Sequence, residues 1–190
     1  MTAKGAARTT WVAVVLYACF LITPQARAQV SQEKLSLQEL ANHLQTPEEI
    51  ARYMWRHFAY ETDQTNLGRD EYWQSPEELL SNQKGDCEDF AIFARELLKR
   101  NGRNSFLVNI YGDGSAHTIC VFKEGGGYNA IDGTDVIRHR ERSLSELLSY
   151  ISPFWRRGEI VTPSFSSKRG NTLKQFDREL RAQRLLDLSV

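Results

Sequence analysis

One amphipathic helix, followed directly by a run of strands, limits most strongly how this chain can fold. In the segment NQKGDCEDFAIFARELLKRNG, residues 82–102, a helical pattern begins after Gly85 and is closed by Asn101 and Gly102. Its apolar face consists of Phe90, Ala91, Ala94, Leu97 and Leu98. A helix with one apolar face has to cover another element, so we expect this helix to lie on the core.

The pattern changes to strands after this helix. The segments SFLVNIY, AHTICVFK and YNAID have the composition of strands, and the turn sequences GDGS and EGGG separate them. Three helices are expected before the long one. Ser36 opens the short pattern SLQELANHL, and Thr46–Pro47 and Ser75–Pro76 each combine a capping residue with a proline at the first helical position. Helices followed by an antiparallel sheet predict an α+β domain.

The remaining sequence predicts two helices and one strand. A capping-box pattern from Ser143 to Glu146 opens a helix, and GEIVT, residues 158–162, is typical of a strand. A last amphipathic helix is expected through Leu173, Phe176, Leu180 and Leu185. We therefore predict one domain over residues 29–190, with a core of about 46–151 and a helical extension of about 152–190.

The sequence of the first 28 residues is typical of a secretory signal. A basic start with Lys4 and Arg8 leads into the apolar run Trp11–Ile22, and Ala26–Ala28 form a small-x-small cleavage site. The run is shorter than the about 20 apolar residues of a permanent membrane anchor. We expect cleavage after Ala28, an exported chain that is periplasmic or secreted, and no permanent anchor. Lipid attachment at Cys19 is the alternative.

The charge balance argues against two kinds of partner. The chain has 24 lysines and arginines against 24 aspartates and glutamates. It therefore has no overall field that would attract nucleic acid or an anionic membrane. The function has to come from a local site.

The expected mature chain keeps two cysteines, Cys87 and Cys120. In an oxidising compartment the simplest interpretation of such a pair is a disulfide; a buried side chain, a metal ligand and a nucleophile are the alternatives. Cys87 lies three residues before Phe90, on the same side of the helix, and so points inward at the helix N-terminus. The helix dipole favours a thiolate by only about 0.3–1 kcal/mol, so a reactive sulfur needs a cation from elsewhere.

Three acids surround this cysteine and permit two interpretations. Asp86 at the N-cap, with Glu88 and Asp89 in the first turn, is typical of a stable helix start. A calcium site is the alternative, although three acids provide fewer than the roughly six to eight oxygens that calcium takes.

The cation could come from His43, His57, His117 or His139. His43 and His57 fall on helices before the cysteine, and His139 lies in the charged run RHRER. His117 differs because it stands early in an apolar strand. Alternation places its side chain on one face and Cys120 on the other.

The next strand carries an acid that could orient His117. If the loop around EGGG holds an even number of residues, Asp132 shares the face of His117, directly opposite or one diagonal step away. Asp132 could then bind one imidazole nitrogen and leave the other for the sulfur. Nucleophile, base and orienting acid are the three groups of acyl transfer.

The segments YWQSPEELLSNQKGDCEDFAIFARELL, AHTICVF and YNAIDGTD resemble the core of the transglutaminase-like superfamily, in particular the bacterial transglutaminase-like cysteine proteinases. The resemblance covers about residues 53–135. It implies a papain-like cysteine peptidase fold, with N-terminal helices packed on an antiparallel sheet. It also implies that Cys87, His117 and Asp132 form the catalytic triad.

The resemblance has two further implications. The tetrahedral anion formed by cysteine attack needs two donors, for which the backbone N–H of Cys87 and the indole N–H of Trp73 are candidates; core packing is the alternative for Trp73. In the adhesin-cleaving branch of the family, acids that flank the cysteine bind calcium. Asp86 and Glu88 match those positions.

Three functions follow as hypotheses. The first is an exported thiol hydrolase that cleaves a peptide or amide bond of a protein or peptide substrate, with no cofactor needed for the chemistry and calcium as a candidate ligand. The second is a transglutaminase, in which an amine replaces water on the same thioester. The third is a non-catalytic binding module with Cys87 and Cys120 joined or buried. Strand alternation argues against the third, since Cys120 faces away from His117 and, by inference, from Cys87.

Overall fold

Local capping signals begin most of the helices in the computed structural model, which describes residues 35–112 and 114–178. Four of them start with a capping box, in which a Ser or Thr side chain and a Glu three residues later satisfy each other's backbone N–H groups. These helices are α1 (Leu37–His43), α2 (Pro47–His57), α4 (Pro76–Asn82) and α6 (Leu144–Ile151). The helix starts expected at Thr46, Ser75 and Ser143 are therefore confirmed. The predicted signal segment, Cys19, Leu180 and Leu185 lie outside the described residues.

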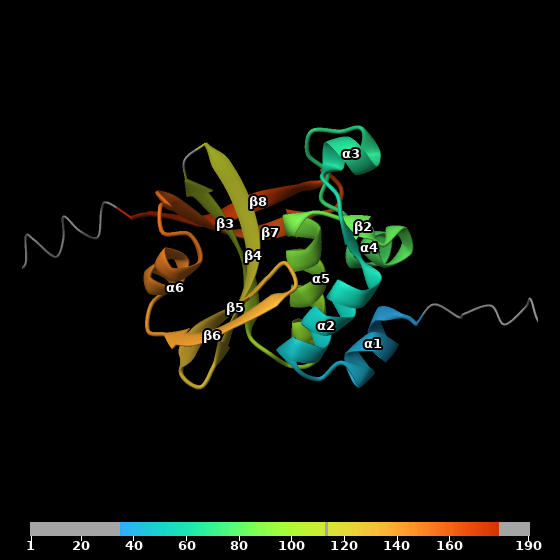
Figure 1. Cartoon of the computed structure of the whole chain (residues 1–190), viewed down its shortest axis with the longest axis horizontal. Helices are drawn as coiled ribbons and strands as arrows, with labels where there is room; N and C mark the ends of the chain where they lie inside the picture. The colour runs from blue at the N-terminus through green and yellow to red at the C-terminus, as the bar shows by residue number, and fades with distance from the viewer. Residues whose placement is uncertain (1–34, 113, 179–190) are drawn as a thin grey trace, which may run out of the picture. The chain divides into compact units, whose positions relative to one another are not determined.

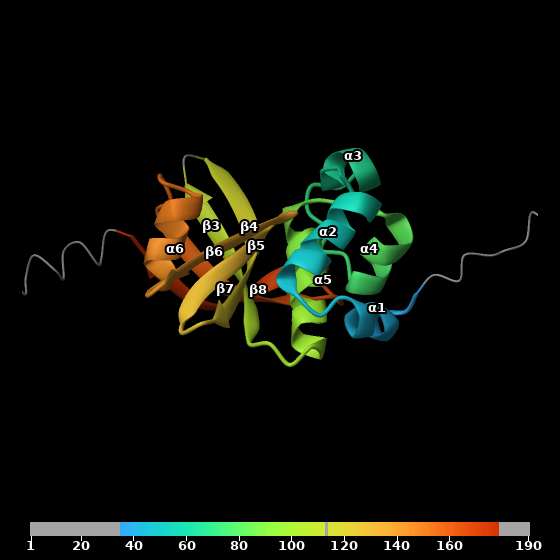
Figure 2. The same ribbon diagram turned by 60° about the horizontal axis from the view of Figure 1, so that its bottom comes forward.

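The central helix is α5 (Cys87–Arg100). The apolar face predicted from its sequence is buried along its whole length. Figures 1 and 2 show α5 between the sheet on one side and α1, α2 and α4 on the other, while α6 covers the opposite face of the sheet. Among the described helices none is both long and apolar enough to cross a bilayer.

The sheet has six antiparallel strands. They are β3 (Ser105–Gly112), β4 (Ser115–Glu124), β5 (Gly127–Asp132), β6 (Asp135–Glu141), β7 (Arg157–Ser164) and β8 (Arg169–Asp177), in the order β6-β5-β4-β3-β7-β8. The strands read from SFLVNIY, AHTICVFK and YNAID are β3, β4 and β5, so the predicted α+β class is confirmed. The sequence did not predict β6, which pairs with β5, or the short helix α3 (Asp63–Leu67).

A second, two-stranded sheet leads into α5. In it β1 (Ala59–Tyr60) runs parallel to β2 (Lys84–Gly85). Gly85 is packed so closely that a Cβ there would lie 2.8 Å from the Cβ of Asp89. The glycine before the cysteine is thus needed for the tight entry into the helix.

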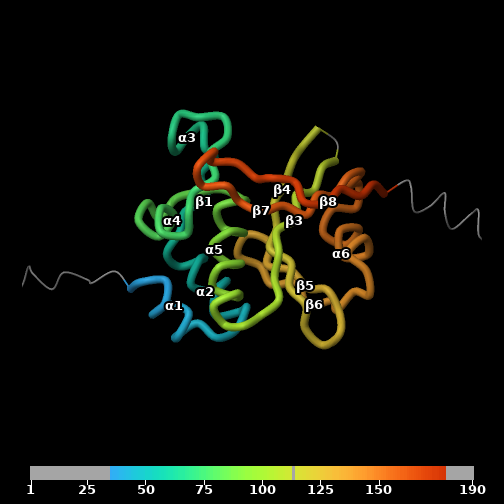
Figure 3. Tube along the Cα trace, turned by 180° about the vertical axis from the view of Figure 1, so that it is seen from behind, coloured from blue at the N-terminus to red at the C-terminus, as the bar shows by residue number. Residues whose placement is uncertain are grey.

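The helical extension expected at the C-terminus is wrong for the described residues. Leu173 and Phe176 lie in β8, which pairs along β7, and β7 pairs with β3 inside the sheet. The spacing of three residues between Leu173 and Phe176 fits a helix. The structure forms a strand instead, and its register shifts at Leu173, between the pairs Ile160–Lys174 and Val161–Thr172, which breaks the alternation expected of a strand. Figure 3 shows this hairpin reaching from the sheet toward α3 and α4, where Lys168 binds the Glu78 carboxylate.

The two faces of β4 belong to different cores. Cys120 and Phe122 pack with the α5 side chains, whereas Ile119 and Val121 pack with α6 and Trp155. Alternation therefore separates Cys120 from the face of His117, as expected. The further step, that Cys120 also faces away from the helix of Cys87, is wrong, because α5 covers the face that carries Cys120. Both cysteines are free thiols.

Candidate active site

Cys87 is the first residue of α5, and its side chain is half-buried. The thiol donates to Oε2 of Glu88 at 3.1 Å, and the backbone N–H of Thr118 donates to the sulfur. Burial raises the pKa of the Cys87 thiol well above its ordinary value, and the Glu88 carboxyl raises it further. Burial and the neighbouring Glu88 carboxyl thus both favour the thiol of Cys87 over the thiolate.

His117 and Asp132 are brought together by the β4–β5 hairpin. The loop holds the two residues between Glu124 and Gly127, the even number that the parity argument requires. Because Cys120 pairs with Ile131, Asp132 lies across from Ile119, one diagonal step from His117 on the same face. Nε2 of His117 lies 2.6 Å from Oδ1 of Asp132. Nδ1 of the imidazole is left for another partner.

The other three histidines lie on different elements. His43 ends α1, and His57 ends α2 with its ring stacked on Tyr53 at 4.3 Å. His139 lies on β6, where its ring centre is 3.8 Å from that of Tyr150. The sequence argument that singled out His117 agrees with these positions.

Trp73 is a core residue in this arrangement. Its side chain is 2% exposed, and its indole N–H donates to Oε1 of Glu71 at 2.6 Å. Its ring packs on β8 so tightly that a Cβ on Gly170 would lie 2.3 Å from it. This packing corresponds to the core alternative that the sequence left open for Trp73.

Four acids converge beside the cysteine. Asp86, Glu88 and Asp89 come from the start of α5, and Asp63 comes from the start of α3. All four side chains are buried to nine-tenths or more. Carboxylate oxygens of Asp63, Asp86 and Asp89 lie within 4.8 Å of one another. Asp63 was missed from the sequence, because it stands in a segment without a motif and reaches the cluster only through the chain fold.

The carboxyls of Asp63, Glu88 and Asp89 have pKa values raised toward the protonated form. Burial and then the charge of Asp86 raise the pKa of Glu88 to about 9 and that of Asp63 to about 6. Burial likewise raises the pKa of Asp89 to about 7, although the backbone and side-chain N–H groups of Gln74 donate to it at 2.8 and 2.6 Å. Ionisation of these carboxyls therefore destabilises the folded protein, and this destabilisation increases with pH.

Two buried oxygens in this cluster have no hydrogen-bond partner. They are Oδ1 of Asp63 and Oδ1 of Asp86, while the second oxygen of each accepts a backbone N–H, from Tyr72 and from Asp63 respectively. Buried polar atoms normally find a partner. Unpaired carboxylate oxygens that face one another are suited to a hard cation such as calcium.

The thiol lies at the start of α5, which packs on the sheet, and strand β4 of this sheet carries a histidine bound to an aspartate. This arrangement is that of a papain-like α+β protein. A protein-family model described as a transglutaminase-like domain matches residues 28–148. The chain belongs to this family. A search of curated proteins gave no match.

Several solved structures are similar to the chain. Against LapG of Legionella pneumophila the identity is 27% over 53% of this chain and 62% of LapG, with a TM-score of 0.40. Against calcium-bound LapG of the same organism it is 20% over 78% of this chain and 85% of that one, with a TM-score of 0.46. Against a candidate cysteine protease of Cytophaga hutchinsonii it is 14% over 74% and 48%, with a TM-score of 0.43. The first alignment spans less than two thirds of LapG.

Proposed function

We propose that this protein is an exported thiol hydrolase that cleaves a peptide or amide bond, with Cys87 as nucleophile, His117 as base and Asp132 as orienting acid. The observation that supports it best is the 2.6 Å contact between Nε2 of His117 and Oδ1 of Asp132, on the strand whose Thr118 backbone contacts the sulfur. The family match is consistent with this chemistry.

The reaction follows from the groups at hand. Asp132 holds Nε2 of the imidazole, which leaves Nδ1 as the proposed acceptor of the thiol proton. For this step the Cys87 sulfur has to leave Glu88, and the side chains of Cys87 and His117 have to turn toward each other. The sulfur then bonds to the substrate carbonyl carbon, and the imidazolium passes its proton to the leaving amine as the C–N bond breaks. Water, deprotonated by the same nitrogen, attacks the thioester and releases the acid and the thiol.

The anion formed in each step needs hydrogen-bond donors. The backbone N–H of Cys87 is one, since the first N–H groups of a helix have no partner within the helix. The indole N–H of Trp73 remains our proposed second donor, and it would have to leave Glu71 to act.

The same residues would serve a transglutaminase, in which a lysine amine replaces the water. The binding-module hypothesis is less well supported, since its disulfide form requires a bond that the two free thiols do not make.

We further propose that the acid cluster binds calcium. Asp63, Asp86 and Asp89 would hold the ion, with Glu88 beside them, and the two unpaired buried oxygens fit such a ligand. A bound calcium would supply positive charge that neutralises the carboxylates next to the sulfur.

The hydrolase proposal is tested by a proteome-wide cleavage profile of the exported protein, which intact-mass analysis should show to begin at Gln29. Cys87→Ala, His117→Ala and Asp132→Asn should each remove the cleavage products. Asp135→Asn, in the exposed turn next to Asp132, is the matched control and should keep them. Products that persist in Cys87→Ala would refute the proposal, and incorporation of an added amine without new termini would favour the transglutaminase.

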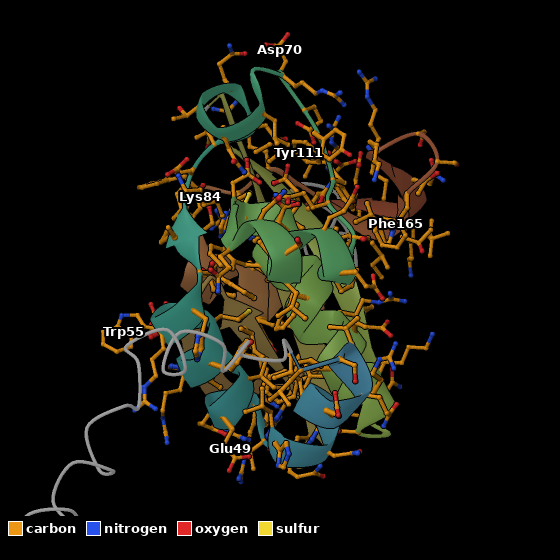
Figure 4. The ribbon with its side chains drawn as sticks, turned by 90° about the vertical axis from the view of Figure 1, so that its right-hand side faces the viewer. Glu49, Trp55, Asp70, Lys84, Tyr111 and Phe165 are labelled. Carbon is orange, nitrogen blue, oxygen red and sulfur yellow. The ribbon has the colours of Figure 1, made fainter. Side chains whose placement is uncertain are left out.

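The calcium proposal is tested by calorimetric titration of calcium into chelator-treated protein. Asp86→Asn should weaken binding by at least tenfold, because it removes a charged ligand. Asp70→Asn, in the segment labelled in Figure 4, is an exposed control that should leave the affinity unchanged. If calcium gives no heat of binding with the unsubstituted protein, the calcium proposal is refuted.

A further inference from the structure

The connection between α3 and α4, residues 68–75, holds two of the four buried acids. The backbone N–H of Tyr72 donates to Oδ2 of Asp63, and the backbone N–H of Gln74 donates to Oδ1 of Asp89 at 2.8 Å. The side-chain amide of Gln74 adds a bond of 2.6 Å to the other oxygen of Asp89. The positions of both carboxyls therefore depend on where this α3–α4 connection lies.

The turn between β7 and β8 binds the middle of this connection. The backbone carbonyl of Lys168, in the turn, accepts the N–H of Trp73 at 3.1 Å. The Trp73 ring packs against Gly170 at the start of β8, where an added Cβ would lie 2.3 Å from it. Figure 3 shows the turn beside α3 and α4. The hairpin thus holds the residue that stands between Tyr72 and Gln74.

The side chain of Lys168 adds a second set of contacts to the same connection. Its Nζ lies 2.7 and 2.6 Å from the two carboxylate oxygens of Glu78, and 4.9 Å from the centre of the Tyr72 ring. The Tyr72 hydroxyl donates to Oε1 of Glu78 at 3.1 Å, which closes the set. Because the backbone of Tyr72 also holds Asp63, these contacts lead directly to the acid cluster.

The backbone of Lys168 supports a specific role for its side chain. The residue has a φ of 55°, in the left-handed region that glycine adopts without strain. A residue with a Cβ is strained there, so glycine would be favoured unless the side chain makes contacts that offset the strain. The contacts of Lys168 with Glu78 and Tyr72 are of that kind.

We propose that Lys168 is a positioning residue for calcium, because it holds the α3–α4 connection where Asp63 and Asp89 can both face the ion. The inference rests on the proposed calcium site, and it adds the β7–β8 hairpin to the elements that form this site. Without the Lys168 side chain the connection would occupy its present position for a smaller fraction of the time. The apparent calcium affinity would fall by that fraction.

The size of the effect follows from the contacts that are lost. An ion pair and a cation–π contact at a partly exposed site each change an equilibrium constant by roughly twofold to fivefold. Lys168→Met keeps most of the side-chain stem and removes the charge, so it should weaken calcium binding about three- to tenfold.

The sign of the effect separates positioning from charge. Lys168 is a cation, and a cation near a calcium site repels the ion. Loss of its charge alone should therefore strengthen calcium binding. Weaker binding in Lys168→Met is the opposite result, and it is expected only if the side chain acts by holding the ligands.

Calorimetric titration of calcium into the chelator-treated full chain measures this effect. Lys168→Arg keeps a cation that can bind Glu78 and stack on Tyr72, so it should restore most of the affinity. Arg169→Gln removes the same charge from the exposed next residue and should not weaken binding. Thermal unfolding of each variant verifies that it is folded at the temperature of the titration.

Hydrogen exchange of the same proteins tests the route from Lys168 to the acids. Without calcium, Lys168→Met should speed the exchange of the backbone amides of residues 72–74, whereas the amide of the buried Leu97 in α5 should be unchanged. In the unsubstituted protein calcium should slow the exchange of residues 72–74 and of the hairpin turn, because coupling between two sites is reciprocal.

The outcomes separate this inference from the calcium proposal. Calcium binding that is as tight in folded Lys168→Met as in the unsubstituted protein would overturn the inference and leave the calcium site. So would weaker binding without faster exchange at residues 72–74, or an equal loss of affinity in Arg169→Gln. If the unsubstituted protein binds no calcium, both proposals are overturned.

Discussion

Asp63→Asn should stabilise the metal-free protein and reduce the stability that calcium adds. Asp63 is 2% exposed, and its Oδ1 has no hydrogen-bond partner. Burial and the charge of Asp86 raise its pKa from 3.8 to about 6. An asparagine keeps the oxygen that accepts from Tyr72 and carries no charge. Its amide could donate to the unpaired oxygen of Asp86.

The size of the effect follows from that pKa. A rise from 3.8 to about 6 corresponds to about 3 kcal/mol, since each tenfold in proton affinity is about 1.4 kcal/mol. Solvent screening at this edge of the domain reduces the value to about 1–2 kcal/mol. A raised acid pKa means that the folded state binds the proton more tightly. This stabilising contribution is complete below pH 3.8 and is lost as pH rises through about 6.

At pH 8, without calcium, the asparagine variant should therefore unfold roughly 2–8 °C above the unsubstituted protein. The difference should disappear near pH 4. With calcium at 100 times its dissociation constant, the unsubstituted protein should gain about 2.7 kcal/mol, and the variant should gain less because it lacks one carboxylate ligand.

Thermal unfolding followed by circular dichroism, with EGTA and with calcium at both pH values, measures all of these shifts. Asp70→Asn serves as the exposed control. The reasoning is refuted if Asp63→Asn lowers the unfolding temperature at pH 8 without calcium, because the carboxylate would then be stabilising where the structure makes it costly.

Three further predictions concern packing. Gly170→Ala should destabilise the protein by about 1–3 kcal/mol, since a Cβ there would lie 2.3 Å from the buried Trp73 ring; an unchanged urea midpoint would contradict this contact. Leu97→Ala, at a fully buried position of α5, should cost about 2–5 kcal/mol in the same assay, and a loss below 1 kcal/mol would argue against the packing of this helix on the sheet. Cys120→Ser should destabilise the protein by about 1–3 kcal/mol, because it buries a hydroxyl, and should leave turnover intact. Thiol titration of the unfolded parent protein without reductant should detect both Cys87 and Cys120. Detection of one thiol or none would contradict the two free cysteines.

The helix starts and the strand faces could be predicted because their causes lie within a few residues. Thr46, Ser75 and Ser143 each cap a helix through a bond to the residue three positions later. Period-two alternation placed Cys120 and His117 on opposite faces of β4, and a two-residue loop then put Asp132 beside His117. Sequence spacing alone is sufficient for such predictions, because within a helix or a strand the spacing fixes the face on which each side chain lies.

Contacts between distant segments were decided only by the tertiary structure. Leu173 and Phe176 have helical spacing, and pairing with β7 through a register shift made them part of a strand. The face of β4 that α5 covers depends on how helix and sheet pack, so the position of Cys120 toward α5 could not be read from alternation.

The acids and Lys168 show the same division. Asp86, Glu88 and Asp89 were visible as a motif because they are adjacent in sequence, whereas Asp63 joins them from 23 residues away through its backbone bond to Asp86. Lys168 reaches Glu78 only because β7 pairs with β3 and carries the hairpin turn to α4. By itself the sequence determined most helix starts, the strands β3 to β5 and the faces on which their side chains lie. The tertiary structure determined which of these faces pack together and which further segments become strands, since long-range pairing depends on the packing of the whole core.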